Sequence, residues 1–518
     1  MSDIVPGTIE SWAALRPNDV ALIEGERSHT YKEWNDQADR VAHALAARGV
    51  NRGDIVILRT QIRSEWAILA SALAKLGCSL LALNWRLTPT ETEYVLSNSR
   101  ANVIICDDPD PEALKPAFAA FDMKLAVSID AVVPGFVHYR ELLEGQGEPL
   151  ISRGDPPLII YTSGTTGLPK GVAMTGRGPA NANDTELMEY LSDVGRRGSP
   201  GQGDAIVLMT MPMHHGAGPG QVWGALRSGK KTIMMRRFDP EGALALIQKY
   251  RVTNWTGVPT MFKRIAGLPP EKLAAYDVSS IRSVGVGASA VPFSLKQWII
   301  ATFGENRLSE GYGATETGMI SFLPSDMQTR KPGSSGRPYK HVEIKIRDED
   351  GNDLAAGETG EIWVKTPVVI RHYLNSSPLG EDTLGKDGFF RVGDVGRVDE
   401  EGYLFITDRA KDMIVSGGVN IYPAEIEAAI ITHPAVQDVA VIGIPDDEFG
   451  EQVKAFCELK PGRTATAEDV LAHCRPLLAS YKHPRSIDFV KELPRNTMGK
   501  LLKRELREPY WKDRERKV

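Results

Sequence analysis

The sequence predicts an α/β protein with a large N-terminal domain, built on parallel-rich sheets and carrying a β-rich subdomain, and a small α+β C-terminal domain. Three observations lead to this prediction. Apolar strands alternate with amphipathic helices over residues 31–106, apolar and polar residues alternate strictly near 343–365, and a compact stretch of mixed pattern follows residue 418. With 518 residues, the chain also exceeds the ~250–300 at which single cores usually stop growing.

The first elements alternate between helix and strand. Trp34, Ala38, Val41 and Leu45 recur at helical spacing, and Gly49 follows as a C-terminal stop. Strands are then expected at 55–58, 79–83 and 103–106, with helices at 64–75 and 91–96 between them. This alternation is typical of βαβ units, whose strands pair in parallel through right-handed crossovers.

One apolar stretch, Trp66 to Trp85, has the length of a membrane span. Lys75 lies at its centre and Gly77 beside it, so we interpret the stretch as helix, turn and strand. We therefore expect no stable membrane insertion.

The remaining elements locate the chemistry. Strands at 158–161 and 205–208 each run into a loop of small or polar residues, and ligands of α/β sheets bind beyond the carboxyl ends of strands. The alternating residues 343–365 indicate a β-meander around Asp-Gly and Gly-rich turns. In the C-terminal part we expect strands at 439–444 and 453–459 and helices near 423–432 and 467–478.

Composition narrows the class of protein. Apolar residues make up 42% and charged residues 25%, which is typical of globular chains. Lys and Arg number 61 against 67 Asp and Glu, a net charge of -6, so no basic field exists to bind nucleic acid. The four cysteines have no metal-ligand spacing, and the N-terminus lacks a basic segment followed by an apolar run. We expect a cytoplasmic protein.

The strongest motif is YTSGTTGLPKG, Tyr161 to Gly171, directly after a buried strand. Hydroxyls, glycine-freed amides and one ammonium are the groups that a polyphosphate needs, so this segment is predicted to be a phosphate loop. Its glycine and lysine spacing differs from the Walker pattern. The predicted contacts are Thr162, Ser163, Gly164, Thr165, Thr166, Gly167 and Lys170.

The loop resembles the signature of a superfamily that contains acyl-CoA synthetases, peptide-synthetase adenylation domains and beetle luciferases. Further motifs follow in the family's order over essentially the whole chain: MPMHH (211–215), VGASA (286–290), GYGATE (311–316), VGD (392–394), DRAKD (408–412) and PRNTMGK (494–500). The resemblance implies an ATP-dependent acid:CoA ligase that uses ATP, Mg²⁺ and coenzyme A. It also implies two αβαβα-type subdomains within residues 1–410 and a mobile domain at 411–518.

The motif GYGATE combines an aromatic ring, glycines and a carboxylate. Such a ring can stack on a purine, and such a carboxylate can bind a hard cation. By resemblance, Tyr312 lines the adenine between Gly311 and Gly313, Thr315 contacts the α-phosphate, and Glu316 holds Mg²⁺. Thr166 is assigned with Glu316 to the metal and to catalysis.

Asp394, in a Gly-Asp turn, is expected to accept hydrogen bonds from the ribose hydroxyls, and Arg409 is expected to bind the same sugar. Two residues depart from the pattern of many relatives: Val392 stands where Thr is common, and Asp408 where Gly is common. These departures affect the details of the ribose site.

Two further assignments follow from the resemblance alone. Lys500 corresponds to the lysine that bridges the substrate carboxylate and the α-phosphate during adenylation, where an ammonium stabilises the charge on the phosphoryl oxygens. Lys411 corresponds to the hinge about which the small domain rotates between steps. The glycine-rich face then brought to the site, where pantetheine needs room, is Ser416, Gly417 and Gly418.

The acyl end is predicted from small residues. By resemblance, His215 is expected to line the carboxylate or thiol path, and Gly287, Ala288 and Ser289 are expected to bound the acyl pocket. The stretch after His215 contains Gly216, Ala217, Gly218 and Gly220, which favours a medium-chain, long-chain or bulky apolar acid over acetate unless Trp223 or Trp255 fills the space. A homodimer is kept as an expectation.

Other functions within the superfamily would require different sequence features. The stretch MPMHHGAGPGQVWGAL has no acidic residue to pair with an amino-acid ammonium. A luciferase-like oxidoreductase commonly ends in an SKL-like signal, whereas this chain ends in RKV. A non-catalytic sensor predicts loss of Lys170, Glu316 or Lys500, and all three are present. An aryl acid:CoA ligase and a ligase that loads a carrier protein stay open as alternatives.

Overall fold

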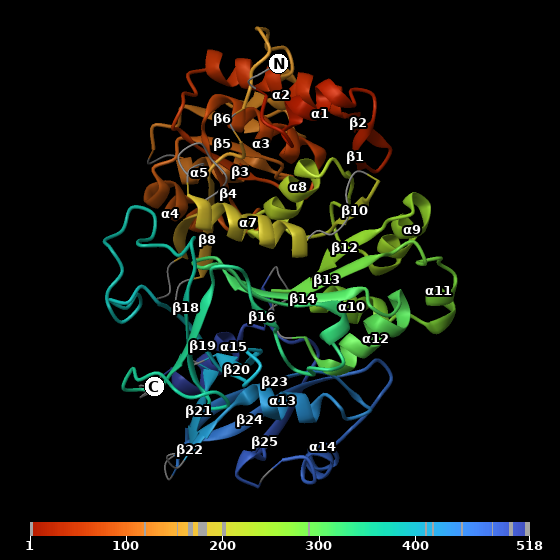
Figure 1. Cartoon of the computed structure of the whole chain (residues 1–518), viewed down its shortest axis with the longest axis vertical. Helices are drawn as coiled ribbons and strands as arrows, with labels where there is room; N and C mark the ends of the chain where they lie inside the picture. Colours follow the sequence, from red (N-terminus) through yellow and green to blue (C-terminus); the bar gives the residue numbers. More distant parts are fainter. Residues whose placement is uncertain are drawn as a thin grey trace.

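The structure, a computed structural model, describes residues 4–118, 121–152, 154–163, 169–174, 184–198, 204–288, 291–409, 412–416, 419–446, 449–478, 480–496 and 501–512. Two large sheets form the upper and middle parts of the molecule in Figure 1, and the C-terminal part lies below them. The predicted fold class is confirmed, with a large N-terminal domain and a smaller C-terminal domain.

The first sheet has the strand order β7-β6-β5-β3-β4-β8-β9, parallel except for the hairpin partner β9. Side chains alternate across it, because Val56 and Leu58 join the main core while Ile57 joins the cluster beneath α4. Helices therefore cover both faces. The strands are β3 (Ile55–Arg59), β4 (Ser79–Ala82), β5 (Val103–Cys106), β6 (Leu125–Ser128), β7 (Val137–His138), β8 (Leu158–Ser163) and β9 (Pro169–Met174). The helices are α1 (Ile9–Leu15), α2 (Tyr31–Ala47), α3 (Ser64–Leu76), α4 (Pro89–Ser99), α5 (Lys115–Phe118) and α6 (Tyr139–Leu142).

The second sheet has the order β16-β15-β14-β13-β12-β10-β11-β1-β2, with a parallel centre and antiparallel edges. Its strands are β1 (Val20–Glu24), β2 (Arg27–Thr30), β10 (Ile206–Met209), β11 (Lys231–Met234), β12 (Asn254–Gly257), β13 (Ser283–Gly287), β14 (Leu308–Ala314), β15 (Gly318–Leu323) and β16 (Arg337–Pro338). The helices are α7 (Thr185–Gly198), α8 (Ala217–Arg227), α9 (Pro240–Tyr250), α10 (Pro259–Ala266), α11 (Pro270–Ala274) and α12 (Phe293–Phe303).

Two smaller sheets complete the chain. The predicted meander is the antiparallel sheet β17 (Glu343–Arg347), β18 (Gly360–Lys365), β19 (Phe390–Val398) and β20 (Leu404–Arg409). The C-terminal sheet contains β21 (Ile414–Ser416), β22 (Val419–Ile421), β23 (Val436–Asp446), β24 (Gly450–Leu459) and β25 (Ser486–Val490). It packs with α13 (Pro423–Ile430), α14 (Ala467–Cys474) and α15 (Lys503–Trp511) around a core of its own.

An ion network with a buried centre at Arg63 and Glu65 joins the two large sheets. Arg63, at the start of α3, pairs with Glu65 and with Asp130 beyond β6, both at 2.9 Å. From the second sheet, Arg27 pairs with Glu65, and Arg236 pairs with Asp130 at 2.7 Å. Arg63 and Glu65 belong to the start of α3 and Asp130 follows β6, whereas Arg27 begins β2 and Arg236 follows β11, so the network links one sheet to the other.

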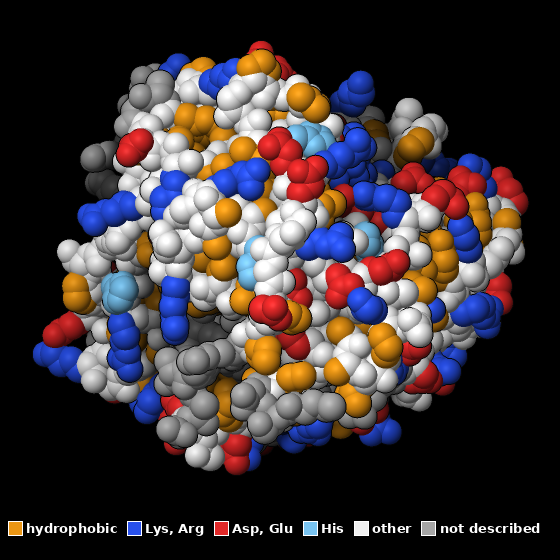
Figure 2. All heavy atoms as spheres, turned by 90° about the horizontal axis from the view of Figure 1, so that it is seen from above, with side chains coloured by type: hydrophobic (Ala, Val, Ile, Leu, Met, Phe, Trp, Pro, Cys, Tyr) orange, Lys and Arg blue, Asp and Glu red, His pale blue; other side chains and the backbone are white. Residues whose placement is uncertain are grey.

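No helix in the described ranges is long and apolar enough to cross a membrane. The apolar stretch at 66–85 forms most of α3 and all of β4, as helix and strand joined at Gly77, which has a left-handed backbone. Figure 2 shows acidic and basic side chains mixed with apolar ones across the face seen from above.

Candidate active site

A large cavity of about 2340 Å³ lies where the carboxyl ends of the central strands meet the C-terminal domain. Its walls come from the flanks of the phosphate loop, from α7 and α8, from β12, β13 and β14, and from the segment 368–395. Among the predicted site residues it is lined by Thr162, Lys170, His215, Gly287, Ala288, Gly311, Gly313, Thr315 and Glu316.

The phosphate-loop motif is a hairpin whose two arms are β8 and β9. Thr162 pairs with Lys170 in the antiparallel ladder, and Ser163 pairs with Pro169 through its backbone. The arms therefore project Thr162 and Lys170 from neighbouring positions into the cavity. The predicted contacts Gly164, Thr165, Thr166 and Gly167 lie outside the described residues, as does the side chain of Ser163.

Glu316 is brought to this hairpin by the turn between β14 and β15. The Thr162 hydroxyl donates to Oε1 of Glu316 at 3.3 Å, and the Tyr373 hydroxyl donates to the same oxygen at 3.4 Å. The backbone carbonyl of Glu316 accepts from the Ile370 amide at 3.0 Å. The phosphate-loop motif and the GYGATE motif thus meet at one carboxylate oxygen, although Thr162 and Glu316 are 154 residues apart in sequence.

Tyr373 is a site residue that the sequence did not reveal. Its ring lies beneath the Lys170 ammonium, 4.9 Å from the ring centroid, and the Leu374 amide donates to the carbonyl of Gly171 at 2.7 Å. Burial, and then the Glu316 carboxylate, raise the pKa of Tyr373 to about 12, so its phenol stays a donor. Because no glycine-rich or charged pattern marks the segment RHYLN, only its contacts identify it.

The second predicted cluster also assembles. The Tyr312 hydroxyl donates to Oδ2 of Asp394 at 2.5 Å, and Asp394 is buried. Asp394 and Arg409 are opposite one another in the ladder between β19 and β20, although the side chain of Arg409 lies outside the described residues. The turn before Asp394 needs a glycine, because Gly393 has a φ of 77°. A carboxylate beside an aromatic ring is thereby fixed at the cavity edge.

The end of β13 approaches β14 closely. A Cβ at Gly287 would meet the carbonyl oxygen of Gly311 at 2.6 Å, so a side chain is excluded there. The next residue, Ala288, has a φ of 66°, a left-handed conformation that costs energy for a residue with a side chain. This strained turn lines the cavity, and Ser289 lies outside the described residues.

The two histidines before α8 both line the cavity. The Nδ1 of His215 accepts from the Ala217 amide at 3.4 Å. Burial, followed by the nearby His215 and Arg86, lowers the pKa of His214 to about 3. His214 is therefore a neutral imidazole at physiological pH.

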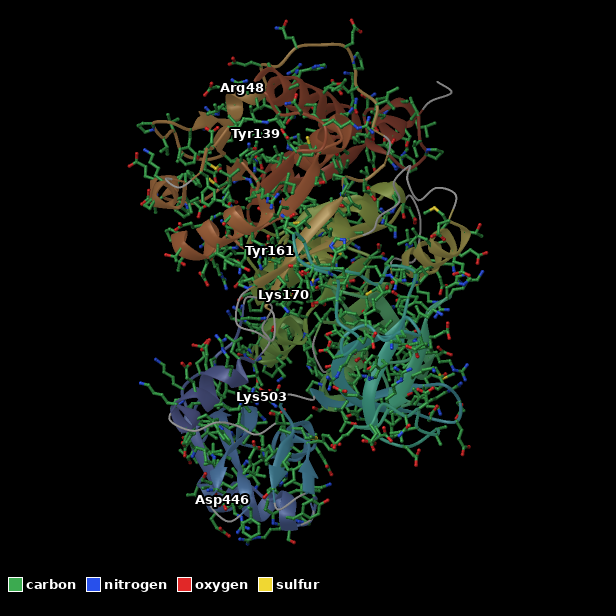
Figure 3. The ribbon with its side chains drawn as sticks, turned by 90° about the vertical axis from the view of Figure 1, so that its left-hand side faces the viewer. Arg48, Tyr139, Tyr161, Lys170, Asp446 and Lys503 are labelled. Atoms are coloured by element: carbon green, nitrogen blue, oxygen red, sulfur yellow. The ribbon has the colours of Figure 1, made fainter. Side chains whose placement is uncertain are left out.

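The C-terminal domain faces the cavity with the residues that flank the Lys500 loop. The Leu502 amide donates to the carbonyl of Pro494 at 2.9 Å and closes the base of that loop, and Arg495, Asn496 and Leu502 line the cavity. Lys500 itself lies outside the described residues. Figure 3 shows Lys503 on the side of this domain nearest to Lys170.

Predicted residues of the hinge and its glycine-rich face are only partly described. Ser416 pairs with Gly450 in the C-terminal sheet, whereas Lys411, Gly417 and Gly418 lie outside the described residues. Next to the predicted hinge residue, Asp412 pairs with Arg507 of α15 at 2.7 Å.

An ion pair also joins the two domains. Lys263 of α10 reaches Oδ1 of Asp438 in β23 at 3.1 Å, and Arg495 pairs with the other oxygen of the same carboxylate. The domain contact therefore includes a carboxylate that is shared between one cation from each domain.

This donor set fits a nucleotide with its cation. No group of three or more metal-ligating His, Cys, Asp or Glu side chains occurs among the described residues. Glu316 offers one carboxylate with the Thr162 hydroxyl beside it. Mg²⁺ is typically held by one or two carboxylates together with substrate phosphates rather than by a protein cage, so these residues fit it.

Comparison with known families gives two matches. Residues 9–374 match the family described as AMP-binding enzyme, and residues 425–500 match the AMP-binding enzyme C-terminal domain. Together they cover both parts of the molecule.

Individual proteins are similar over nearly the full length. The indoleacetate–CoA ligase of Aromatoleum aromaticum is 35% identical, over 96% of this chain and 97% of the relative. A fatty acid–[acyl-carrier-protein] ligase, ScoC of Streptomyces coeruleorubidus, is 33% identical over 98% and 96%. The crystal structure of ATP-bound MatB from Rhodopseudomonas palustris superposes with a TM-score of 0.84 at 30% identity, over 98% of this chain and 99% of that one.

Proposed function

Because the chain belongs to the AMP-binding enzyme family of the adenylate-forming superfamily, as an AMP-forming acid–thiol ligase, we propose that it joins a bulky or long-chain carboxylic acid to coenzyme A. The observation that carries this proposal is the contact of Thr162, Tyr373 and Glu316 beside Lys170 in one cavity. It joins a phosphate-binding hairpin to a carboxylate suited to a cation.

In the first step, an oxygen of the substrate carboxylate attacks the α-phosphorus of ATP. The bond between the α- and β-phosphates breaks, and pyrophosphate leaves with its electron pair. Lys170 faces the polyphosphate, Tyr312 and Asp394 hold the nucleoside, and Lys500 enters with its loop to stabilise the charge that spreads over the phosphoryl oxygens. Glu316 would hold Mg²⁺, and the ion would supply further neutralisation of the charge on the phosphoryl oxygens.

In the second step, the thiol sulfur of coenzyme A attacks the acyl carbon of the adenylate. The carbon–oxygen bond to AMP breaks, AMP leaves, and the thiol proton passes to solvent or to a nearby base. We propose that residues 411–518 rotate about Lys411 between the steps, so that Ser416, Gly417 and Gly418 replace the Lys500 loop. Division into two steps is chemically necessary, because a free carboxylate has no good leaving group for a thiol.

The size of the acid is inferred from the room at the acyl end. A Cβ at Gly220 or Gly224 of α8 would meet nothing within 4 Å, and both glycines line the cavity. Trp223 and Trp255 both border the cavity, but each ring also packs in the core: Trp255 against Phe262 with ring centroids 4.4 Å apart, and Trp223 against Trp66 at 6.1 Å. Relatives named for indoleacetate and for fatty acids support an acid larger than acetate.

Pyrophosphate release with ATP and Mg²⁺ tests the proposal. A panel of fatty, aromatic and alicyclic acids is measured with no acceptor, with coenzyme A and with a pantetheinylated carrier protein. We expect release that increases with coenzyme A, together with acyl-CoA in the products. Release that responds only to the carrier protein would reassign the acceptor, and release with trapped adenylate and oxygen consumption would point to an oxidoreductase.

The variant Lys500→Ala separates the two steps. We expect it to lose adenylation and to retain thioester formation from supplied acyl-adenylate, because the ammonium acts only on the phosphoryl transfer. Lys503→Ala is the matched control, since Lys503 pairs with Glu427 at 2.8 Å. An unimpaired first step in Lys500→Ala would contradict the role given to this lysine.

A further inference from the structure

The acyl end of the cavity has a floor made by one face of three parallel strands. In β13, Val284 is buried in the core and Val286 is buried at the cavity wall, whereas Ser283, Gly285 and Gly287 share the face that is turned to the cavity. The neighbouring strands are in register with it, so Asn254 pairs with Ser283, Gly285 with Ser309, and Gly287 with Gly311. Because residues two apart share a face of a strand, the floor consists of small or polar residues along its whole length.

The polar side chains of this floor lie at a distance from the predicted nucleotide site. Gly287 and Gly311 form the row nearest to the nucleotide motifs, and Ser309 and Thr256 lie one row further along. Asn254 and Ser283 form the next row. At about 3.3 Å per residue, the two polar rows are roughly 7 and 13 Å from the first.

Helices α7 and α8 cover this floor, on the side of β12, β13 and β14 that faces the N-terminal sheet in Figure 1. Leu191, Val194 and Gly195 face the cavity from α7, and Gly220 and Gly224 face it from α8. At each of these three glycines an added Cβ would meet nothing within 4 Å. Glycine is a poor helix former, so these glycines lower the stability of the helices while they leave the cavity open.

Gln221 lies between those α8 glycines and lines the same cavity. Both Oε1 and Nε2 of its carboxamide are shielded from solvent and have no hydrogen-bond partner among the described residues. Buried polar groups are nearly always hydrogen-bonded, because an unsatisfied one loses its hydration without compensation. A ligand that enters the cavity is the natural source of the missing partner.

We propose that the acid carries hydrogen-bonding substituents, such as hydroxyl or carbonyl groups, on a bulky skeleton, and that Gln221 selects for them. The polar rows of the floor receive further substituents of the same kind. This inference rests on the proposed ligase function and replaces the purely apolar acid expected from the sequence with a substituted one. Its chemical class is a hydroxylated or oxidised alicyclic, polycyclic or long-chain acid.

The test compares acids that differ only in a distal polar group. The probes are 5β-cholanic acid against its 3α-hydroxy derivative, and dodecanoic against 12-hydroxydodecanoic acid, each assayed for acyl-CoA formation. We expect the hydroxylated member of at least one pair to have a kcat/KM about 10-fold higher or more, since a site built to bond a hydroxyl rejects the analogue that lacks it.

The variant Gln221→Met then assigns the effect. It keeps the side-chain length and removes the amide, so we expect the ratio of kcat/KM between the hydroxylated and the unsubstituted acid to fall by about 10-fold. Its melting temperature should be unchanged or higher, because a buried unsatisfied amide is gone. Gln248→Met is the matched control, because Gln248 accepts from the Asp277 amide at 2.7 Å on α9, away from the cavity lining.

The outcomes separate the two proposals. Turnover with no preference for hydroxylated acids, or a preference that Gln221→Met leaves unchanged, overturns this inference and leaves the ligase function intact. Absence of acyl-CoA with every acid and acceptor contradicts the ligase function and this inference together.

Discussion

The two ends of the cavity are built differently. At the nucleotide end, charged and hydroxyl side chains come from loops at strand termini and touch one another, as Thr162 and Tyr373 do at Glu316. At the acyl end, glycines and a few amide or hydroxyl groups are spread over helix faces and a sheet face, and Gln221 touches no polar partner among the described residues. The first end is assembled before a ligand arrives, whereas the second leaves room and bonding capacity for one.

This difference predicts different consequences of mutation. A change at the nucleotide end should lower the rate with every acid by a similar factor, because all acids use the same phosphoryl transfer. A change at the acyl end should alter the ranking of acids. The predictions below run from the largest expected effect to the smallest.

Glu316→Gln should have the largest effect. It keeps the shape and removes the charge, so we expect kcat for adenylation to fall by about 10²–10³-fold with all acids, as for loss of one preorganised electrostatic group. ATP–pyrophosphate exchange measures it, with titration of Mg²⁺ in both proteins. Glu358→Gln, at an exposed turn where the carboxylate accepts from the Ala355 amide, serves as the control. A loss confined to certain acids would break the distinction between the two ends.

Low pH should loosen both ends of the cavity together. The phosphate-loop hairpin belongs to the first sheet and the acyl floor to the second, and the ion network around Glu65 joins the two sheets. Burial would raise the pKa of Glu65, but its bonds to Arg63 and Arg27 outweigh that effect and lower it from 4.5 to about 2. A carboxylate with a lowered folded-state pKa stabilises the fold above its unfolded pKa, and that contribution is lost as the pH falls from 4.5 towards 2. It amounts to on the order of 3 kcal/mol.

The pH prediction is measured by urea unfolding between pH 6 and pH 3. Glu65→Gln should be less stable at pH 6 and should show a shallower loss of stability towards pH 3 than the unaltered protein. Glu241→Gln is the control, because that carboxylate pairs with Lys272 at the surface, where ion pairs contribute little. Equal pH dependence in the Glu65 variant and the unaltered protein would count against the network as the acid-sensitive contact between the sheets.

Asp394→Asn should have a smaller effect, limited to nucleotide binding. Hydrogen bonds to a charged group contribute more than those to a neutral amide, so we expect KM for ATP to rise by about 10-fold with little change in the ranking of acids. Tyr312→Phe removes the hydroxyl that donates to Asp394 and keeps the ring, so it should raise KM by less. Initial rates against ATP concentration test both, and a changed preference among acids would show that this pair also shapes the acyl end.

Gly224→Ala should have the smallest effect and the opposite sign for stability. Its Cβ would meet nothing within 4 Å, so we expect a gain of about 0.5–1 kcal/mol from better helix propensity, with slower turnover of bulky acids only. Gly218→Ala on the same helix is the control, because its Cβ would meet the Pro212 carbonyl oxygen at 2.3 Å and should destabilise the protein. Thermal unfolding of the pair gives the result, and a destabilised Gly224→Ala would show that the space is needed for the fold itself.

The difference between the two ends of the cavity also explains which features could be predicted from the sequence. The strand at 103–106 and the helix at 64–75 agree with β5 and α3 within a residue or so, because their periodic burial is local. The helix expected to run to residue 478 ends at Cys474 and is followed by turns in which the Leu478 amide still donates to the Cys474 carbonyl at 3.0 Å, so the apolar pattern continues past the regular helix. Motif residues such as Glu316 and Asp394 were found because each lies in a contiguous signature.

The acyl end and Tyr373 were harder to predict for a physical reason. Their residues act through contacts between segments that are far apart in sequence, and each alone is an ordinary Gly, Ser, Asn, Gln or Tyr. Small residues after His215 indicated room, but the polar rows of β12, β13 and β14 appear only once the register of three strands is fixed. A pattern within one segment cannot carry that information.

The carboxylate of Asp438 is shared by Lys263 from the large domain and Arg495 from its own. If the domains part, Arg495 leaves with Asp438, so no carboxylate is stranded without a cation. The separation exchanges one partly exposed pair for water, at a cost of at most about 1 kcal/mol. Such a contact orients the domains without resisting their movement, and its weakening by salt would make the resting orientation depend on ionic strength.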